Sequence, residues 1–342
     1  MSVLDSNISS VRILLSLLLT ITMGVHPSAS SQVLSHTLVI IDTGFDTSIE
    51  PIRSAVVFES CIMDWNFCPN SSPFQEGLGS ATINSTNLVM NGIAHGTQMA
   101  GIALAVNPNQ RLVLVRLIAY NSKGQRLPVY ESTIIQAFKW VISKQVELNI
   151  GAVAMAQGHH NLRQDKDYCP KSLELENLIL ELTGSNVPVF FPAGNSGDKS
   201  RIDWPACIPS SFAIGAIDSR SKITTYSNYD RKLIDFYAPG SSQAILPGGQ
   251  FSSATGTSVS TIIAASYWME VKNLRPELKL IDIRQIFRTT SPIVFDSKFR
   301  YGRKIDIEGA RNFVKHLSSV SFSSYALFRV VIQQISNRWL PQ

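Results

Sequence analysis

Short apolar runs of strand length alternate along this chain with stretches of helical periodicity, and this alternation limits the possible folds strongly. The apolar runs lie at residues 37–41, 111–118, 150–156, 187–191, 212–217 and 233–237. A run that is apolar on both faces suits a parallel strand covered by helices on both sides. The alternation therefore predicts right-handed β-α-β crossovers and an α/β fold with three layers, α/β/α, around a mainly parallel central sheet.

Apolar residues recur at helical spacing between these runs. The periodic stretches at 132–148, 172–184 and 280–291 predict helices, as does the alanine- and glycine-rich stretch at 95–105. Another helix, beginning near Ser258, is apolar on nearly every side, so we expect it to be buried at the centre of the fold. Residues 51–90 are rich in serine, asparagine, proline and glycine, and we interpret them as an irregular surface excursion.

Length and charge set the domain organisation. The 342 residues, of which 44% are hydrophobic, suffice for one large α/β domain. We expect a signal peptide at 1–30, a folded domain at 31–316 and a C-terminal extension of unknown role at 317–342. The net charge of +5 comes from scattered basic residues that do not gather with aromatic ones. The chain therefore lacks the pattern of a nucleic-acid-binding surface, and we expect no nucleic-acid partner.

The first thirty residues have the layout of a secretory signal peptide. Arg12 precedes an apolar run at 13–25, and small residues around Ser30 provide a cleavage site. This pattern predicts export, to the outside of the cell or a periplasm, with no stable membrane insertion after cleavage. An uncleaved membrane anchor is the alternative, because the leader is only weakly positive and carries Asp5. Only residues 31–36 separate the expected cleavage point from the first strand.

The chain has four cysteines, an even number that fits two disulfides in an exported protein: Cys61, Cys68, Cys169 and Cys207. Three pairings are possible, and we favour a local link between Cys61 and Cys68 and a longer one between Cys169 and Cys207. A zinc site is the competing interpretation, but the chain has no Cys-x-x-Cys pair with matching histidines. We interpret His159-His160 as loop residues and expect no metal and no cofactor.

Three polar residues follow a strand or begin a helix at one expected edge of the sheet. They are Asp42, His95 and Ser258. A serine hydroxyl becomes a nucleophile when a histidine takes its proton, and the histidine needs a carboxylate that fixes its tautomer. Asn195, in a glycine-flanked turn after another strand, supplies an amide donor for the oxyanion that such an attack creates. The alternative for Ser258 alone is an ordinary helix cap.

Four motifs carry a resemblance to a known family. Ile41-Asp42-Thr43-Gly44, His95-Gly96-Thr97, Ala193-Gly194-Asn195 and Gly256-Thr257-Ser258 resemble the four signatures of the subtilisin-like (subtilase) serine peptidases, in the same order. Further similarities lie at Trp204-Pro205-Ala206 and around Tyr226 and Phe236. The resemblance extends over roughly residues 36–312 and implies the subtilisin-like fold.

The resemblance implies a role for each matching residue. Ser258 would be the nucleophile, His95 the general base and then acid, Asp42 its orienting partner, and Asn195 the oxyanion donor. Ala156, Gln157 and Gly158 match the segment that pairs with a polypeptide substrate bound as an extended strand. Ala193 and Gly194 would line the pocket for the residue before the cleaved bond. The implied activity is that of an exported serine endopeptidase.

The sequence departs from the usual family pattern in several places. Gln157 puts an amide where an apolar side chain normally shapes a subsite, and Gln98 replaces a common second histidine. Residues 104–111 are too few for the calcium loop of many relatives, and we do not favour Asp46 as an ion ligand. The short 31–36 segment leaves no room for a propeptide, so we expect a protein that folds without one or is controlled by an inhibitor or activator in trans.

Two other functions remain open on the sequence. A related acyl transferase or macrocyclase would pass the same acyl group to an amine instead of water. A catalytically silent pseudoprotease would only bind peptides, although the intact set of Asp42, His95, Ser258 and Asn195 argues against it. A serine esterase of the α/β-hydrolase class is disfavoured because no Gly-x-Ser-x-Gly motif occurs.

Overall fold

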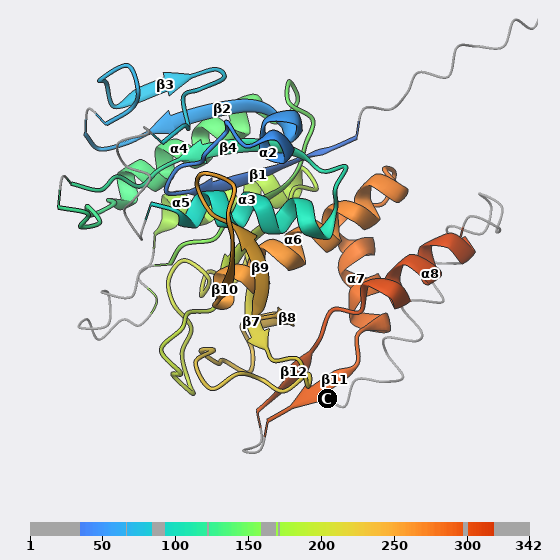
Figure 1. Cartoon of the computed structure of the whole chain (residues 1–342). Helices are drawn as coiled ribbons and strands as arrows, with labels where there is room; N and C mark the ends of the chain where they lie inside the picture. Colours follow the sequence, from blue (N-terminus) through green and yellow to red (C-terminus); the bar gives the residue numbers. More distant parts are fainter. Residues whose placement is uncertain are drawn as a thin grey trace, which may run out of the picture. The chain divides into compact units, whose positions relative to one another are not determined.

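The computed structural model describes residues 35–65, 67–83, 93–121, 123–158, 169, 172–296 and 300–317. At its centre is an eight-stranded sheet in the order β3-β2-β4-β1-β5-β6-β7-β8 (Figure 1). All neighbouring strands in it are parallel except β2 and β3, which are antiparallel. The strands are β1 (Thr37–Asp42), β2 (Val56–Ile62), β3 (Phe74–Glu76), β4 (Arg111–Arg116), β5 (Ile150–Met155), β6 (Val189–Pro192), β7 (Phe212–Ile217) and β8 (Ile234–Pro239).

Helices cover both faces of this sheet. Successive side chains of a strand point to opposite faces, so Leu38 and Ile40 of β1 belong to one core and Val39 and Ile41 to the other. The first core is closed by α2 (Glu50–Ala55), α3 (His95–Val106), α6 (Thr257–Leu274), α7 (Leu280–Thr290) and α8 (Ile307–Leu317). The second is closed by α4 (Glu131–Lys144) and α5 (Leu173–Gly184). The three-layer α/β/α prediction is confirmed.

Helix α6 lies at the centre of the first core, against α3 and strands β1, β5, β6, β7 and β8 (Figure 1). Nearly all its residues from Thr257 to Lys272 are buried, as its apolar sequence predicted. Trp268 packs against the rings of Phe190 and Phe212, at centroid distances of 5.9 and 5.3 Å. Full burial of a large apolar side chain contributes about 1.5–3 kcal/mol, so the helix that carries Ser258 is held rigidly.

The prediction of an irregular excursion at residues 51–90 is wrong for its first half. This segment contains α2, β2 and β3, and β2 lies inside the sheet between β3 and β4. Glu59 and Ser60 interrupt the apolar pattern of β2, yet both are buried. The Glu59 carboxylate accepts the backbone N–H of Ala81 at 2.9 Å, and burial raises the pKa of Glu59. A buried polar residue with a fixed partner is compatible with an inner strand.

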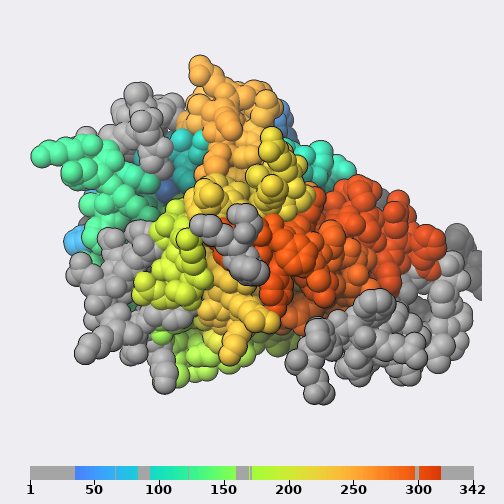
Figure 2. Space-filling view, turned by 90° about the horizontal axis from the view of Figure 1, so that it is seen from below, coloured from blue at the N-terminus to red at the C-terminus, as the bar shows by residue number. Residues whose placement is uncertain are grey.

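Two antiparallel hairpins were not predicted. The first, β9 (Ser241–Ile245) with β10 (Phe251–Thr255), leads directly into α6. The second, β11 (Ile293–Phe295) with β12 (Tyr301–Arg303), lies beside β8, where the N–H of Ile305 donates to the carbonyl of Tyr237 at 2.9 Å. Seen from below, the orange and red surface of these C-terminal elements adjoins the yellow residues that precede them (Figure 2).

The structure contains both disulfides that the sequence analysis favoured, Cys61–Cys68 and Cys169–Cys207, with Cα–Cα distances of 5.8 and 6.0 Å. In the described part of the chain, every helix is too short or too polar to cross a membrane. The predicted signal peptide, the His159-His160 pair and the extension beyond residue 317 lie outside the described residues.

Candidate active site

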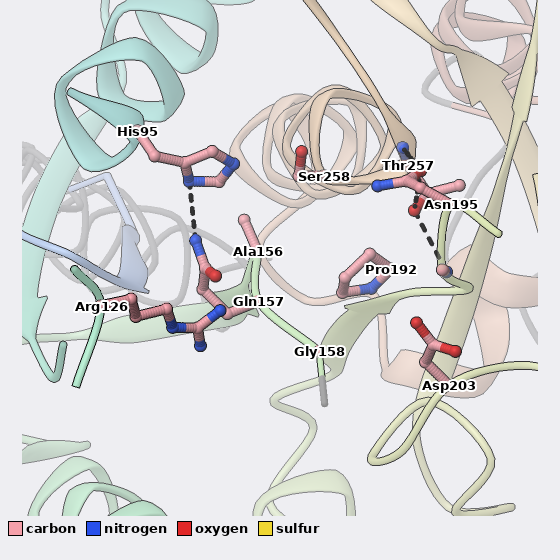
Figure 3. Close-up of a pocket in the computed structure, with 11 residues that line it drawn as sticks. His95, Arg126, Ala156, Gln157, Gly158, Pro192, Asn195, Asp203, Thr257 and Ser258 are labelled. Carbon is pink, nitrogen blue, oxygen red and sulfur yellow. Dashed lines mark hydrogen bonds between the residues drawn. The ribbon is translucent and has the colours of Figure 1, made fainter. Parts of the chain in front are cut away.

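The carboxyl ends of β1, β5 and β6 meet the N-termini of α3 and α6 at one edge of the sheet. Strand β1 has β4 on one side and β5 on the other, which makes this edge a topological switch point, where open α/β sheets bind their ligands. A cleft of about 250 Å³ opens here (Figure 3). Its lining residues are His95, Arg126, Ala156, Gln157, Gly158, Pro192, Gly194, Asn195, Asp203, Thr257 and Ser258.

Asp42 contacts His95 because of its position in β1. Two-residue periodicity places Asp42 on the same face as Leu38 and Ile40, the face that α3 and α6 cover. The carboxylate is fully buried, and its two oxygens lie 2.8 and 2.9 Å from Nδ1 of His95. An Nδ1–H bond to this carboxylate leaves Nε2 unprotonated and able to accept a proton.

Thr43 and Gly96 fix the distance between β1 and the start of α3. The Thr43 hydroxyl donates to the carbonyl of Ile93 at 3.2 Å and accepts the N–H of Gly96 at 3.0 Å. A Cβ atom on Gly96 would lie 2.3 Å from the carbonyl oxygen of Gly44. Residue 96 must therefore be glycine for the helix to approach the strand so closely, and this approach brings His95 to Asp42.

Ser258 is the second residue of α6 and is largely buried. The cap position belongs to Gly256, whose φ is +150°, and Ser258 does not cap the helix through its side chain. The turn before it is braced by the carbonyl of Gly240, which accepts the N–H of Gly256 and the hydroxyl of Tyr226, both at 2.9 Å. Burial raises the pKa of Tyr226, so this phenol remains a donor over the neutral pH range.

Asn195 is oriented by Thr257. The N–H and the hydroxyl of Thr257 donate to Oδ1 of Asn195 at 2.8 and 3.0 Å, and the same hydroxyl accepts the N–H of Gly194 at 3.2 Å (Figure 3). With its oxygen held in this way, the Asn195 amide presents its NH₂ group on the side of Gly256 and the cleft. Sequence analysis missed this role of Thr257, although it is the central residue of the Gly256-Thr257-Ser258 motif.

Gln157 contacts the Asp42–His95 pair. Its Nε2 lies 3.1 Å from Oδ1 of Asp42 and 2.8 Å from Nδ1 of His95 (Figure 3). Nδ1 has one in-plane position, which holds either a hydrogen or a lone pair. It can therefore donate to Asp42 or accept from Gln157, but cannot do both. With the amide reversed, the Gln157 oxygen would face the Asp42 carboxylate, so the two groups compete in either orientation.

His95 and Ser258 line the same cleft, and in Figure 3 the second ring nitrogen faces the serine. Among the described residues, the structure records no hydrogen bond between these two side chains. The bond from base to nucleophile is often long or misaligned in a protein without substrate and shortens when substrate binds.

The other predicted binding residues fall into two groups. Ala156, Gln157, Gly158 and Gly194 line the cleft, whereas Ala193 is fully buried behind it. The sequence analysis did not identify the lining residues Arg126, Pro192 and Asp203. Only tertiary structure brings Arg126 here, but Asp203 directly precedes the Trp204-Pro205-Ala206 motif, which marked this segment.

The carboxylate of Asp46 is engaged within the fold. Asp46 is buried, and its side chain accepts the N–H of Gly248 at 2.8 Å and the hydroxyl of Ser48 at 2.5 Å. Within the described ranges, no three or more His, Cys, Asp or Glu residues gather in an arrangement that could hold a metal ion.

Residues 35–310 match the model of the subtilase family of peptidases. This chain belongs to the subtilase family. It is 28% identical over 240 residues to subtilisin of Bacillus pumilus, an alignment that spans 66% of this chain and 80% of the relative. Against subtilisin E of Bacillus subtilis strain 168 the identity is also 28%, over 66% of this chain and 58% of the relative. The chain thus spans little more than half the length of some curated relatives.

The fold also resembles solved structures. The protease domain of PatA superposes with a TM-score of 0.64 at 19% identity, over 82% of this chain and 95% of that one. A cold-adapted subtilisin-like serine proteinase superposes with a TM-score of 0.58 at 21% identity, over 79% of this chain and 86% of that one, which shows the shared fold.

Proposed function

We propose that this subtilase is an exported serine endopeptidase that hydrolyses peptide bonds through an acyl-enzyme on Ser258. The observation that carries the proposal is the contact of His95 Nδ1 with Asp42 at 2.8 Å, in a cleft that His95 shares with Ser258. Family membership supports the serine-peptidase class. The roles of individual residues rest on their geometry and chemistry.

In the first half-reaction, His95 Nε2 takes the hydroxyl proton of Ser258 while Oγ forms a bond to the carbonyl carbon of the substrate. The tetrahedral intermediate then collapses, the C–N bond breaks, and the proton on His95 passes to the leaving amine. In the second half-reaction, His95 takes a proton from water as the water oxygen attacks the ester. Collapse returns that proton to Ser258 and releases the carboxylic acid. Asp42 stabilises the imidazolium in both halves.

The oxyanion of both intermediates needs donors that are fixed in advance. The NH₂ group of Asn195, held through its oxygen by Thr257, supplies one donor. The N–H of Ser258 supplies a second, because the first N–H groups of a helix have no partner within that helix. The positive end of the α6 dipole adds to the stabilisation of negative charge there.

The substrate is a polypeptide that binds in an extended form along residues 156–158, which continue β5 into the cleft. Backbone hydrogen bonds to such an extended segment form with many substrate sequences, and side-chain pockets then select among these substrates.

Export is supported by the leader pattern and by two disulfides, which form and persist in oxidising compartments. We propose the organisation given by the sequence: a signal peptide at 1–30, the peptidase domain at 31–316 and an extension at 317–342. Control by an inhibitor or activator in trans belongs to the same proposal.

The test is hydrolysis of a quenched fluorescent peptide library by the purified protein, with Ser258→Ala as the matched control. We expect cleavage by the wild type and none by the variant, and products with a new carboxylate from water. Products in which an amine has replaced water would favour the acyl-transferase alternative. A folded wild type that cleaves nothing would contradict the proposal and favour the pseudoprotease.

A further inference from the structure

One wall of the cleft carries a negative charge whose function the hydrolytic mechanism does not explain. Asp203 lines the cleft together with Ser258 and is the one carboxylate among its described lining residues. The other charged lining side chain is Arg126, which lies on the opposite side, beside Gln157 (Figure 3).

The Asp203 carboxylate lies between two backbone segments that have no side chain at the point of approach. A Cβ atom on Gly194 would lie 2.3 Å from Oδ2 of Asp203, and one on Gly158 would lie 3.9 Å from the same oxygen. Gly194 also has a φ of +105°, which favours glycine. The two glycines therefore let both backbone segments approach the Asp203 carboxylate closely. The part of the cleft between Gly158 and Gly194, with Asp203 in its wall, is termed the slot below.

The carboxylate is held in place from behind. Asn228 donates from Nδ2 to Oδ1 of Asp203 at 2.9 Å, and the backbone N–H of Asp203 donates to the carbonyl of Ala193 at 2.8 Å. Asn228 is itself almost fully buried, and its backbone N–H donates to the carbonyl of Gly194 at 2.9 Å. Its side-chain oxygen accepts from Ser196 and from the N–H of Asp198. Asp203 is thus fixed to the same turn that carries Asn195.

This arrangement suits the recognition of a cation. A half-buried carboxylate attracts a cation more strongly than an exposed one, because the surrounding protein screens the charge less than water does. A hydrogen bond to a charged group contributes about 1.5–3 kcal/mol, roughly twice the value for a neutral pair. A substrate carboxylate in the same slot would be repelled. An apolar substrate side chain would remove water from the Asp203 carboxylate without offering it a hydrogen bond.

We propose that the side chain of the residue before the cleaved bond enters this slot, and that Asp203 selects arginine or lysine there. The inference rests on the proposed endopeptidase function and names its substrate class. The slot suits that residue because its walls are Gly158, in the substrate-pairing segment, and Gly194, next to the oxyanion donor Asn195. A side chain next to the reacting carbonyl would be held between these same two segments.

The test compares kcat/KM for peptides that differ only at the residue before the cleaved bond: arginine, lysine, citrulline, leucine and glutamate. Citrulline has the shape of arginine without its charge. For the wild type we expect arginine and lysine to exceed citrulline by about 10²-fold, a ratio that corresponds to about 2.7 kcal/mol, with glutamate the poorest.

Asp203→Asn should lower the arginine-to-citrulline ratio at least tenfold while cleavage of the leucine peptide persists. The asparagine keeps an oxygen that can accept from Asn228, so the turn should be maintained. Asp218→Asn, an exposed site away from the cleft lining, makes the same change in charge and should leave the ratio as in wild type.

Two results would overturn the inference while leaving the endopeptidase proposal intact. One is a wild type that cleaves leucine or citrulline peptides as well as arginine peptides. The other is an unchanged arginine-to-citrulline ratio in Asp203→Asn. If that variant fails to fold, the wild-type ratio alone still decides. A wild type that cleaves no peptide and reacts with no serine-directed probe would instead overturn the endopeptidase proposal, and this inference with it.

Discussion

Removal of Asp42 should trap His95 in the wrong tautomer, because Gln157 would then be the neighbour left at Nδ1. In the structure, Nδ1 lies 2.8 Å from the Asp42 carboxylate and 2.8 Å from the Gln157 amide nitrogen. In Asp42→Ala, the Gln157 amide in the orientation seen in the structure donates its N–H to Nδ1 without competition. The ring hydrogen then lies on Nε2, which can no longer accept the proton of Ser258.

The magnitudes follow from the relative strengths of the two bonds. A hydrogen bond to a charged group contributes about 1.5–3 kcal/mol and one between neutral groups about 0.5–1.5 kcal/mol. From the midpoints of these ranges, the Asp42 bond is favoured by roughly 1.25 kcal/mol, about eightfold, so Gln157→Leu alone should change kcat less than about threefold. Asp42→Ala should lose about 10⁴-fold, as other triads do without their carboxylate.

The double variant Asp42→Ala/Gln157→Leu distinguishes this account from simple loss of the carboxylate. Without the amide donor, the ring regains its productive tautomer, so the double variant should be about fivefold more active than Asp42→Ala, the ratio expected for about 1 kcal/mol. The assay is kcat on one peptide for all variants, with Gln98→Leu as control. Gln98, which lies on α3, is likewise a partly buried glutamine, but its side chain donates to Ser252 and not to Asp42 or His95.

Equal or lower activity of the double variant would refute the reasoning. Equal or lower activity is also the result expected if Gln157 served only to orient the His95 ring. If Gln98→Leu raised the activity of Asp42→Ala by a similar factor, the gain would come from general changes near α3 and not from the tautomer of His95.

Three further predictions concern the oxyanion site, the disulfides and a buried acid. Asn195→Ala should lower kcat by about 10²–10³-fold with little change in KM, the range known for the equivalent change in subtilisin; an unchanged kcat would remove Asn195 from the oxyanion site. Cys169→Ser/Cys207→Ser opens a loop of 38 residues and should lower the free energy of unfolding by about 3.9 kcal/mol, against about 2.4 kcal/mol for the 7-residue loop of the other disulfide. Urea unfolding checks both values, and a larger loss for the shorter loop would contradict them. Burial raises the pKa of Glu59, so this carboxyl group ionises at a lower pH in the unfolded chain than in the folded protein. The free energy of unfolding therefore falls as pH rises above 4.5. Glu59→Gln should remove that fall in the same assay, and a fall that persists unchanged would assign it to other groups.

The sequence predicted the sheet, and also that the candidate site residues would gather at one edge of it, because both depend on local patterns. Fully apolar runs such as 150–156 have few alternatives to buried parallel strands. Motifs that follow such strands reach one edge of a parallel sheet, which is why Asp42 and Asn195 could be placed together with His95 and Ser258. The buried central helix α6 followed from its composition in the same way.

Features that depend on contacts between distant residues were missed. Strand β2 was overlooked because Glu59 reads as a surface residue until the N–H of Ala81 is known to satisfy it. The competition between Gln157 and Asp42 involves residues 115 positions apart, and no spacing rule connects them. The position of Asp203 between Gly158 and Gly194 likewise appears only when three separate segments are packed together.

The most direct test of the account is labelling of the purified wild type and Ser258→Ala with a fluorophosphonate, followed by mass spectrometry of the labelled peptide. A fluorophosphonate reacts with a serine whose hydroxyl is activated by a neighbouring base. The account predicts one adduct, on Ser258, that is absent from the variant and strongly reduced in Asp42→Ala. Failure of the folded wild type to react, or an adduct on another serine, would contradict it.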